Sequence, residues 1–71
     1  MHPLELKDKW NLNYSELAIA LGFESELSCR AWAFRKEAKR YSEPTKQVKI
    51  AAFLLDQYWQ LQGKPVFVEA D

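Results

Sequence analysis

The side chains best suited to chemistry in this sequence are basic ones, gathered in its middle third. Residues 30–49 contain seven lysines and arginines against Glu37 and Glu43, a local balance of 7 − 2 = +5. The flanking segments are acidic, at −3 over residues 1–29 and −2 over residues 50–71, so the formal net charge is zero. A basic patch on an acidic remainder attracts a polyanion locally. The pattern therefore predicts nucleic-acid binding, with a solvated lysine-rich helix face as the alternative.

Residue types for catalysis are not assembled in this sequence. It shows no carboxylate pair, nucleophile–base pair or phosphate-binding glycine loop, so we expect no enzyme activity. His2 is the only histidine and Cys29 the only cysteine, so no zinc site or internal disulfide is expected. No cofactor or small-molecule ligand is expected either. Without a secretory leader or an apolar run of roughly 20 residues, we expect a cytoplasmic protein with no membrane contact.

The first half of the chain predicts two short helices. Pro3 suits the first turn of a helix over about residues 3–10. Asn13 and Glu16 have the spacing of a capping box, which predicts a second helix over residues 14–21. Gly22 then suits the left-handed conformation that ends many helices.

Two further helices are expected in the second half. Ser25 is the predicted cap of a third helix over residues 26–36, and good helix formers allow it to extend further. Thr45 is the predicted cap of a fourth helix over residues 46–62, which Gly63 ends. The sequence therefore predicts an all-α fold, a small four-helix domain.

The second and third predicted helices have the geometry of a helix-turn-helix motif, in which two short helices meet at a tight turn. Ala18 is small enough for a close helix crossing. Cys29 and Trp32 lie three residues apart on one face of the third helix and, with Phe23, are expected to pin it onto the second. The opposite face is then available to enter a major groove of DNA.

Residues 15–23, SELAIALGF, resemble the first helix and turn of small phage repressors of the Cro and lambda-repressor type. Residues 28–32, SCRAW, resemble the middle of their recognition helix, and Pro44-Thr45 before an apolar helix resembles the next segment of many such domains. The resemblance implies a sequence-specific duplex-DNA-binding protein, a small transcriptional repressor that reads the major groove with residues 26–36. The alternative function is a helical protein–protein adaptor in a phage, plasmid or transposition system.

The residues expected at the DNA are found by turning Cys29 and Trp32 inward. The candidate base-reading residues on the outward face are Leu27, Ser28, Arg30, Ala31, Phe34 and Arg35. The planar fork of Arg30 matches the O6 and N7 atoms of guanine, and the apolar members suit a thymine methyl group. The expected phosphate contacts are Lys36, Lys39, Arg40 and Lys46. Leu27 and Phe34 have a second interpretation, burial against the fourth helix or a partner.

The fourth predicted helix carries two apolar stripes separated by a polar wedge. The stripe expected to close the core is Val48, Ala51, Ala52, Leu55, Tyr58 and Trp59, and the wedge is Lys49, Asp56 and Gln60. The second stripe exceeds what one small core needs and predicts a homodimer on an inverted DNA repeat. Its expected interface is Ile50, Phe53, Leu54, Leu61, Val66, Phe67 and Val68. Alternatively, the first helix and the tail cover this stripe.

The domain boundary is expected near residue 63. Residues 1–63 form the predicted helix-turn-helix DNA-binding domain, and residues 64–71 form a C-terminal tail. Within the tail, Val66–Val68 have β propensity and could form a short dimerising strand. Disorder and folding back over the same domain are the other two interpretations of the tail.

Overall fold

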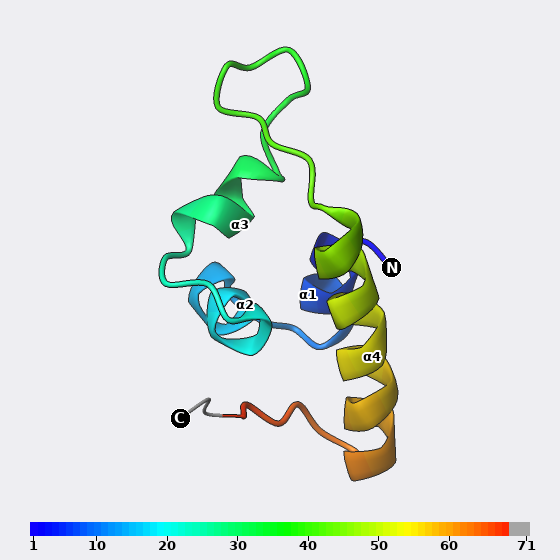
Figure 1. The fold of residues 1–71 in the computed structure, drawn as a ribbon. Helices are drawn as coiled ribbons and strands as arrows, with labels where there is room; N and C mark the ends of the chain where they lie inside the picture. The colour runs from blue at the N-terminus through cyan, green and yellow to red at the C-terminus, as the bar shows by residue number, and fades with distance from the viewer. Residues whose placement is uncertain (69–71) are drawn as a thin grey trace.

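Four helices make up most of the molecule, a computed structural model that describes residues 1–68. They are α1 (Pro3–Lys9), α2 (Tyr14–Leu21), α3 (Leu27–Ala31) and α4 (Lys46–Gln62). The long α4 runs along one side, with α1 and α2 packed against it and α3 packed on α2 (Figure 1). Residues 1–68 contain no strand. The predicted mostly helical domain with four helices is therefore confirmed.

Capping interactions explain where α2 and α4 begin and end. The Asn13 side chain accepts the N–H of Glu16 at 2.7 Å, and the Glu16 carboxylate accepts the N–H of Asn13 at 3.0 Å. Thr45 caps α4 through its hydroxyl oxygen. Gly22 and Gly63 end the two helices in the left-handed conformation, at φ of 81° and 76°, which glycine adopts without steric cost. The predicted bounds of both helices are confirmed.

The core lies where α1, α2 and α4 meet, and α3 contributes to it through its inward face. Its buried apolar residues are Leu6, Leu12, Leu17, Ala18, Cys29, Trp32, Ala52 and Trp59. Cys29 and Trp32 are buried as predicted, and the Phe23 ring meets Trp32 edge-on at 5.5 Å between centroids. Burial, with a smaller contribution from Glu26, raises the pKa of the Cys29 thiol to about 11. Cys29 is therefore a packing residue without thiolate chemistry at neutral pH.

The third helix is much shorter than predicted, because α3 ends at Ala31 rather than continuing to residue 36. The carbonyl of Ala31, which would accept the N–H of Arg35 in a longer helix, accepts that of Ser42 at 3.2 Å. Continuation would also place like charges four residues apart, Arg35 with Lys39 and Lys36 with Arg40, and each such pair disfavours a helix. Helix propensity alone missed both effects.

Helix α4 buries one stripe and exposes the other, with two corrections to the predicted faces. Tyr58, assigned to the core stripe, is 40% exposed, whereas Asp56, assigned to the polar wedge, is only 5% exposed. The second apolar stripe lies on the surface: Ile50, Phe53, Leu54 and Leu61 are between 49% and 83% exposed. Neither α1 nor the tail covers it, so that alternative is wrong.

The tail folds back over its own domain, and the predicted strand at Val66–Val68 is absent. The Trp59 indole N–H donates to the carbonyl oxygen of Val66 at 2.9 Å, and the Phe67 ring lies 5.9 Å from the Trp59 ring. Of the predicted tail, residues 69–71 lie outside the described residues. Val66 is therefore held within its own chain.

Candidate nucleic-acid interface

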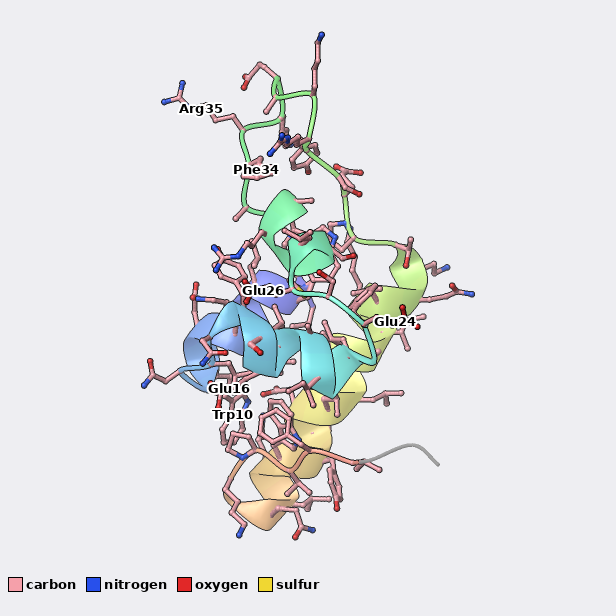
Figure 2. All side chains as sticks on the ribbon, turned by 90° about the vertical axis from the view of Figure 1, so that its left-hand side faces the viewer. Trp10, Glu16, Glu24, Glu26, Phe34 and Arg35 are labelled. Atoms are coloured by element: carbon pink, nitrogen blue, oxygen red, sulfur yellow. The ribbon has the colours of Figure 1, made fainter. Side chains whose placement is uncertain are left out.

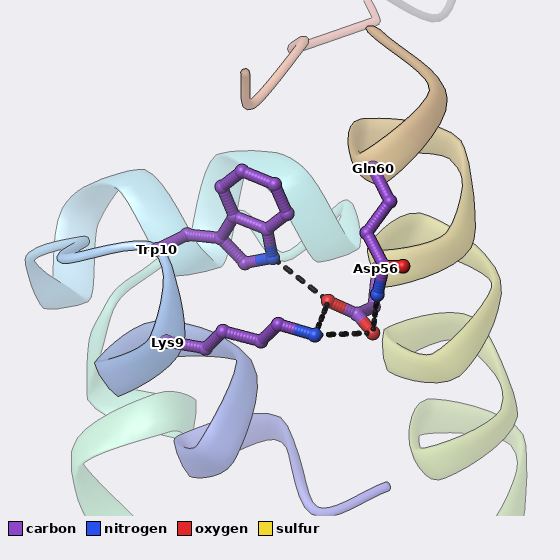
Figure 3. Close-up of polar contacts among 4 residues, drawn as sticks. All are labelled: Lys9, Trp10, Asp56 and Gln60. Carbon is purple, nitrogen blue, oxygen red and sulfur yellow. Dashed lines mark hydrogen bonds and ion pairs between the residues drawn. The ribbon is translucent and has the colours of Figure 1, made fainter. Parts of the chain in front are cut away.

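The single buried charge of the described residues, Asp56, braces α1 against α4 (Figure 3). Its carboxylate accepts hydrogen bonds from Lys9 Nζ at 3.0 Å, Trp10 Nε1 at 2.9 Å and Gln60 Nε2 at 2.8 Å. Burial alone would raise the pKa of Asp56, but the hydrogen bonds and the Lys9 charge outweigh it, so the pKa lies below its ordinary value. Both carboxylate oxygens are engaged, which fits a structural role.

The outer face of α3 carries a shallow groove that gathers most of the predicted base-reading residues. The groove has a volume of about 490 Å³, and its lining is Leu27, Arg30, Ala31, Phe34 and Arg40. Leu27 is 71% exposed and Phe34 is 41% exposed, so neither is buried against α4. The lining therefore combines three apolar side chains with two arginines.

Two predicted base-reading residues lie outside this groove. Ser28 lines a different groove of about 610 Å³, which also has Phe23, Trp32 and Val48 in its walls and runs toward the start of α4. Arg35 lies beyond the end of α3, and its side chain extends away from the helical body (Figure 2). With α3 ending at Ala31, Phe34 and Arg35 cannot act as recognition-helix residues, although Phe34 still reaches the outer groove.

Arg30 is the base-reading candidate with the most defined environment. Its Nε donates to Glu26 Oε1 at 3.1 Å, one helical turn back, and its guanidinium carbon lies 4.8 Å from the centre of the Tyr14 ring. The side chain remains about half exposed. An exposed pair at this spacing is weak, typically about 0.3–0.5 kcal/mol, so it does not prevent Arg30 from contacting another partner.

Residues 33–42 form a basic loop that projects from the helical body, at the top of Figure 1. The loop turns twice, where the N–H of Ala38 donates to the carbonyl of Arg35 and the N–H of Tyr41 donates to that of Ala38. The exposed bases of the loop are Arg35, Lys36, Lys39 and Arg40, against the single acid Glu37. Within residues 1–68 none of these four bases is in an ion pair.

The predicted phosphate-contacting residues thus divide between two elements. Three of them, Lys36, Lys39 and Arg40, lie on the basic loop, and Arg40 also reaches the outer groove of α3. Lys46 is exposed at the first residue of α4 and lines neither groove. The sequence analysis placed Lys36 on the third helix and allowed that helix to extend over Lys39 and Arg40, whereas the structure has a loop at all three residues.

In residues 1–68 no three histidine, cysteine, aspartate or glutamate side chains are grouped as metal ligands. No helix in this part of the chain is long and apolar enough to cross a membrane. No family model matches the chain, and no curated protein or solved structure is significantly similar to it.

Proposed function

We propose that the protein binds duplex DNA as a small sequence-specific regulator, with the outer face of α3 at the base edges and the basic loop on the phosphates. The observation that carries the proposal is the joint surface of these two elements. It presents five exposed basic side chains, and within the described residues only Arg30 has an acidic partner. The five are Arg30, Arg35, Lys36, Lys39 and Arg40. Because the formal net charge of the protein is zero, this positive charge is concentrated locally, on α3 and the basic loop.

The two elements suit different contacts with DNA, the basic loop with phosphates and the outer face of α3 with base edges. Phosphate contacts supply affinity and fix orientation, whereas contacts with base edges supply specificity. The four loop bases are long, exposed side chains suited to phosphates. The outer groove of α3 combines Arg30, whose fork matches guanine, with the apolar side chains of Leu27, Ala31 and Phe34, which suit a thymine methyl group.

The turn between α2 and α3, which begins at the C-cap residue Gly22, supports the same proposal. The N–H of Phe23 donates to the carbonyl of Ala18 at 2.9 Å, and Gly22 provides the left-handed turn. Because Cys29 and Trp32 are buried, α3 is held by its inward face and keeps its outer face open to solvent. Both features would suit a helix-turn-helix in which a short helix approaches the major groove, and they support the proposal in that sense.

Binding to random duplex DNA measured over a range of salt concentrations tests the proposal. We expect Lys39→Gln to weaken binding to all sequences alike and to reduce the slope of log K against log salt by about 1. Lys64→Gln is the matched control, since Lys64 is also exposed but lies beyond the far end of α4, and it should leave the slope unchanged. Arg30→Ala should instead remove preference at one base pair of a selected site. Wild-type protein without salt-dependent duplex binding would contradict the proposal and favour a protein–protein adaptor.

We further propose that DNA is bound by a homodimer joined through α4. Between Ile50 and Gln62 the only charged residue is the buried Asp56, so the exposed apolar stripe is flanked by uncharged glutamines in this part of α4. A two-fold contact places the same surface against itself, and a face without exposed charge does so without repulsion. An exposed apolar stripe of this kind typically marks a partner surface. The strand contact predicted for Val66–Val68 is not part of this proposal.

Sedimentation over micromolar concentrations tests the dimer. We expect wild type to sediment as a dimer and Leu54→Asp as a folded monomer, because two like charges would face each other across the axis. Gln57→Asp is the comparison variant. It adds the same charge beside the stripe and not within it, so it should weaken the dimer less. A symmetric dimer should select an inverted repeat with half-sites about 34 Å apart. A wild-type monomer at every concentration would contradict the dimer and leave DNA binding by single copies in place.

A further inference from the structure

The contacts around Arg30 indicate how it could recognise a base pair, an inference that rests on the proposed function. We propose that Glu26 and Tyr14 are positioning residues that hold the Arg30 guanidinium ready to recognise one guanine in duplex DNA. Glu26 lies at the start of α3 (Figure 2), and Tyr14 is the first residue of α2. Two helices therefore contribute to fixing one arginine.

The contact with Glu26 uses only part of the guanidinium. The carboxylate accepts from Nε of Arg30 at 3.1 Å, and within residues 1–68 the two terminal nitrogens form no hydrogen bond. Those terminal nitrogens carry donors in the fixed fork that can meet O6 and N7 of guanine together. Glu26 thus restrains the group from behind and leaves its recognition edge open.

The contact with Tyr14 restrains the same group from a second direction. The guanidinium carbon lies 4.8 Å from the Tyr14 ring centre, within the range of a cation–π interaction. Lys7 of α1 lies over the same ring, with its Nζ at 4.8 Å, so the ring is anchored to α1 as well. Holding Arg30 before DNA arrives reduces the side-chain entropy lost on binding.

The negative charge of Glu26 allows a positioning role to be distinguished from a general contribution to DNA affinity. An exposed ion pair contributes little to folding. The Glu26 carboxylate lies beside the basic residues of the proposed interface and repels phosphate, so it lowers the affinity for every DNA sequence equally. Glu26 therefore raises the preference for the correct site only if it improves the geometry of Arg30, because its charge alone changes specific and unspecific binding by the same factor.

The test compares affinities for a selected duplex, for each single base-pair substitution of it, and for random duplex. Arg30→Ala first identifies the base pair that Arg30 reads. Glu26→Gln should raise affinity for random duplex and lower preference at that same base pair about two- to fivefold. Tyr14→Leu should lower the same preference without raising random binding. Tyr14→Phe should retain it, because the ring and not the hydroxyl contacts Arg30. Lys64→Gln, at an exposed lysine beyond the far end of α4, is the control and should leave the preference intact.

The outcomes distinguish this inference from the proposed function. If wild type binds duplex DNA and Arg30→Ala loses one base preference, but Glu26→Gln and Tyr14→Leu keep it, the positioning role is overturned and DNA binding stands. If Glu26→Gln changes affinity for all sequences by one factor, Glu26 acts only through its charge and the positioning role is again wrong. If wild type shows no salt-dependent duplex binding, the proposed function and this inference fall together.

Discussion

Trp59→Ala is expected to remove most of the stability of the fold. Trp59 is the largest fully buried side chain, with its ring edge-on to Trp10 at 5.7 Å and its indole N–H bonded to Val66. Truncating a buried tryptophan to alanine costs about 3–5 kcal/mol. A domain of this length has a free energy of unfolding of only about 4–10 kcal/mol. Thermal unfolding followed by far-UV circular dichroism should show a loss of more than about 10 °C in Tm, or no folded protein.

Trp59→Phe separates packing from the hydrogen bond. This variant keeps a buried ring but cannot donate to Val66, so it should lose only about 1–2 kcal/mol and release the tail. A Trp59→Ala protein that unfolds within a few degrees of wild type would show that the α1–α4 contact does not depend on this side chain.

Asp56→Ala is expected to have the second-largest effect, about 3 kcal/mol of destabilisation. The substitution removes three hydrogen bonds, two of which join Lys9 and Trp10 at the end of α1 to α4, and it leaves the Trp10 indole N–H without its acceptor. Asp56→Asn is the matched control, because it keeps an oxygen for Trp10 but loses the charge and the second oxygen, which accepts from Lys9 and Gln60. Its cost should be clearly smaller, and Lys9→Met should cost least because Lys9 is half exposed.

The same carboxylate predicts how stability depends on pH. The pKa of Asp56 is lower in the folded protein than in the unfolded chain, so the unfolded state binds the proton more readily. The Asp56 contribution is therefore complete above the ordinary aspartate pKa of about 3.9 and is lost as the pH falls through the folded-state value. The Tm difference between wild type and Asp56→Asn should shrink as the pH is lowered below about 4. A difference that stays constant across this range would contradict the lowered pKa.

Local signals in the sequence were sufficient for the two helices with strong caps. The Asn13–Glu16 box and Gly22 predicted the bounds of α2, and Thr45 with Gly63 predicted those of α4. Each signal works within a few residues, through hydrogen bonds and backbone conformation that the residue types themselves determine. The predicted end of α3 was wrong. The Ala31 carbonyl accepts the N–H of Ser42, eleven residues later in the chain, and no local sequence pattern predicts such a hydrogen bond.

The candidate interface was predictable in composition but not in arrangement. Periodicity placed Cys29 and Trp32 inward, so the outward position of Arg30 could be deduced from the helical repeat. The contact between Arg30 and Tyr14 joins two helices and depends on how they cross, so spacing could not reveal it. Asp56 was misplaced for a similar reason, because its partners Lys9 and Trp10 lie more than forty residues away in the chain.

The way the basic loop is attached to the body allows its length and sequence to vary. Residues 33–42 leave the body after the buried Trp32 and return before the buried Pro44, with Ser42 bonded to Ala31 at the neck. Among the helices, α3 approaches only α2 at the backbone level, whereas the Trp59 and Asp56 contacts join α1 and α4. Insertions into such a loop are tolerated well, since doubling its length costs only about 0.6 kcal/mol in closure entropy. Loop length and composition can therefore vary, and with them the length of duplex that the proposed interface would cover, while the α1–α4 scaffold stays as it is.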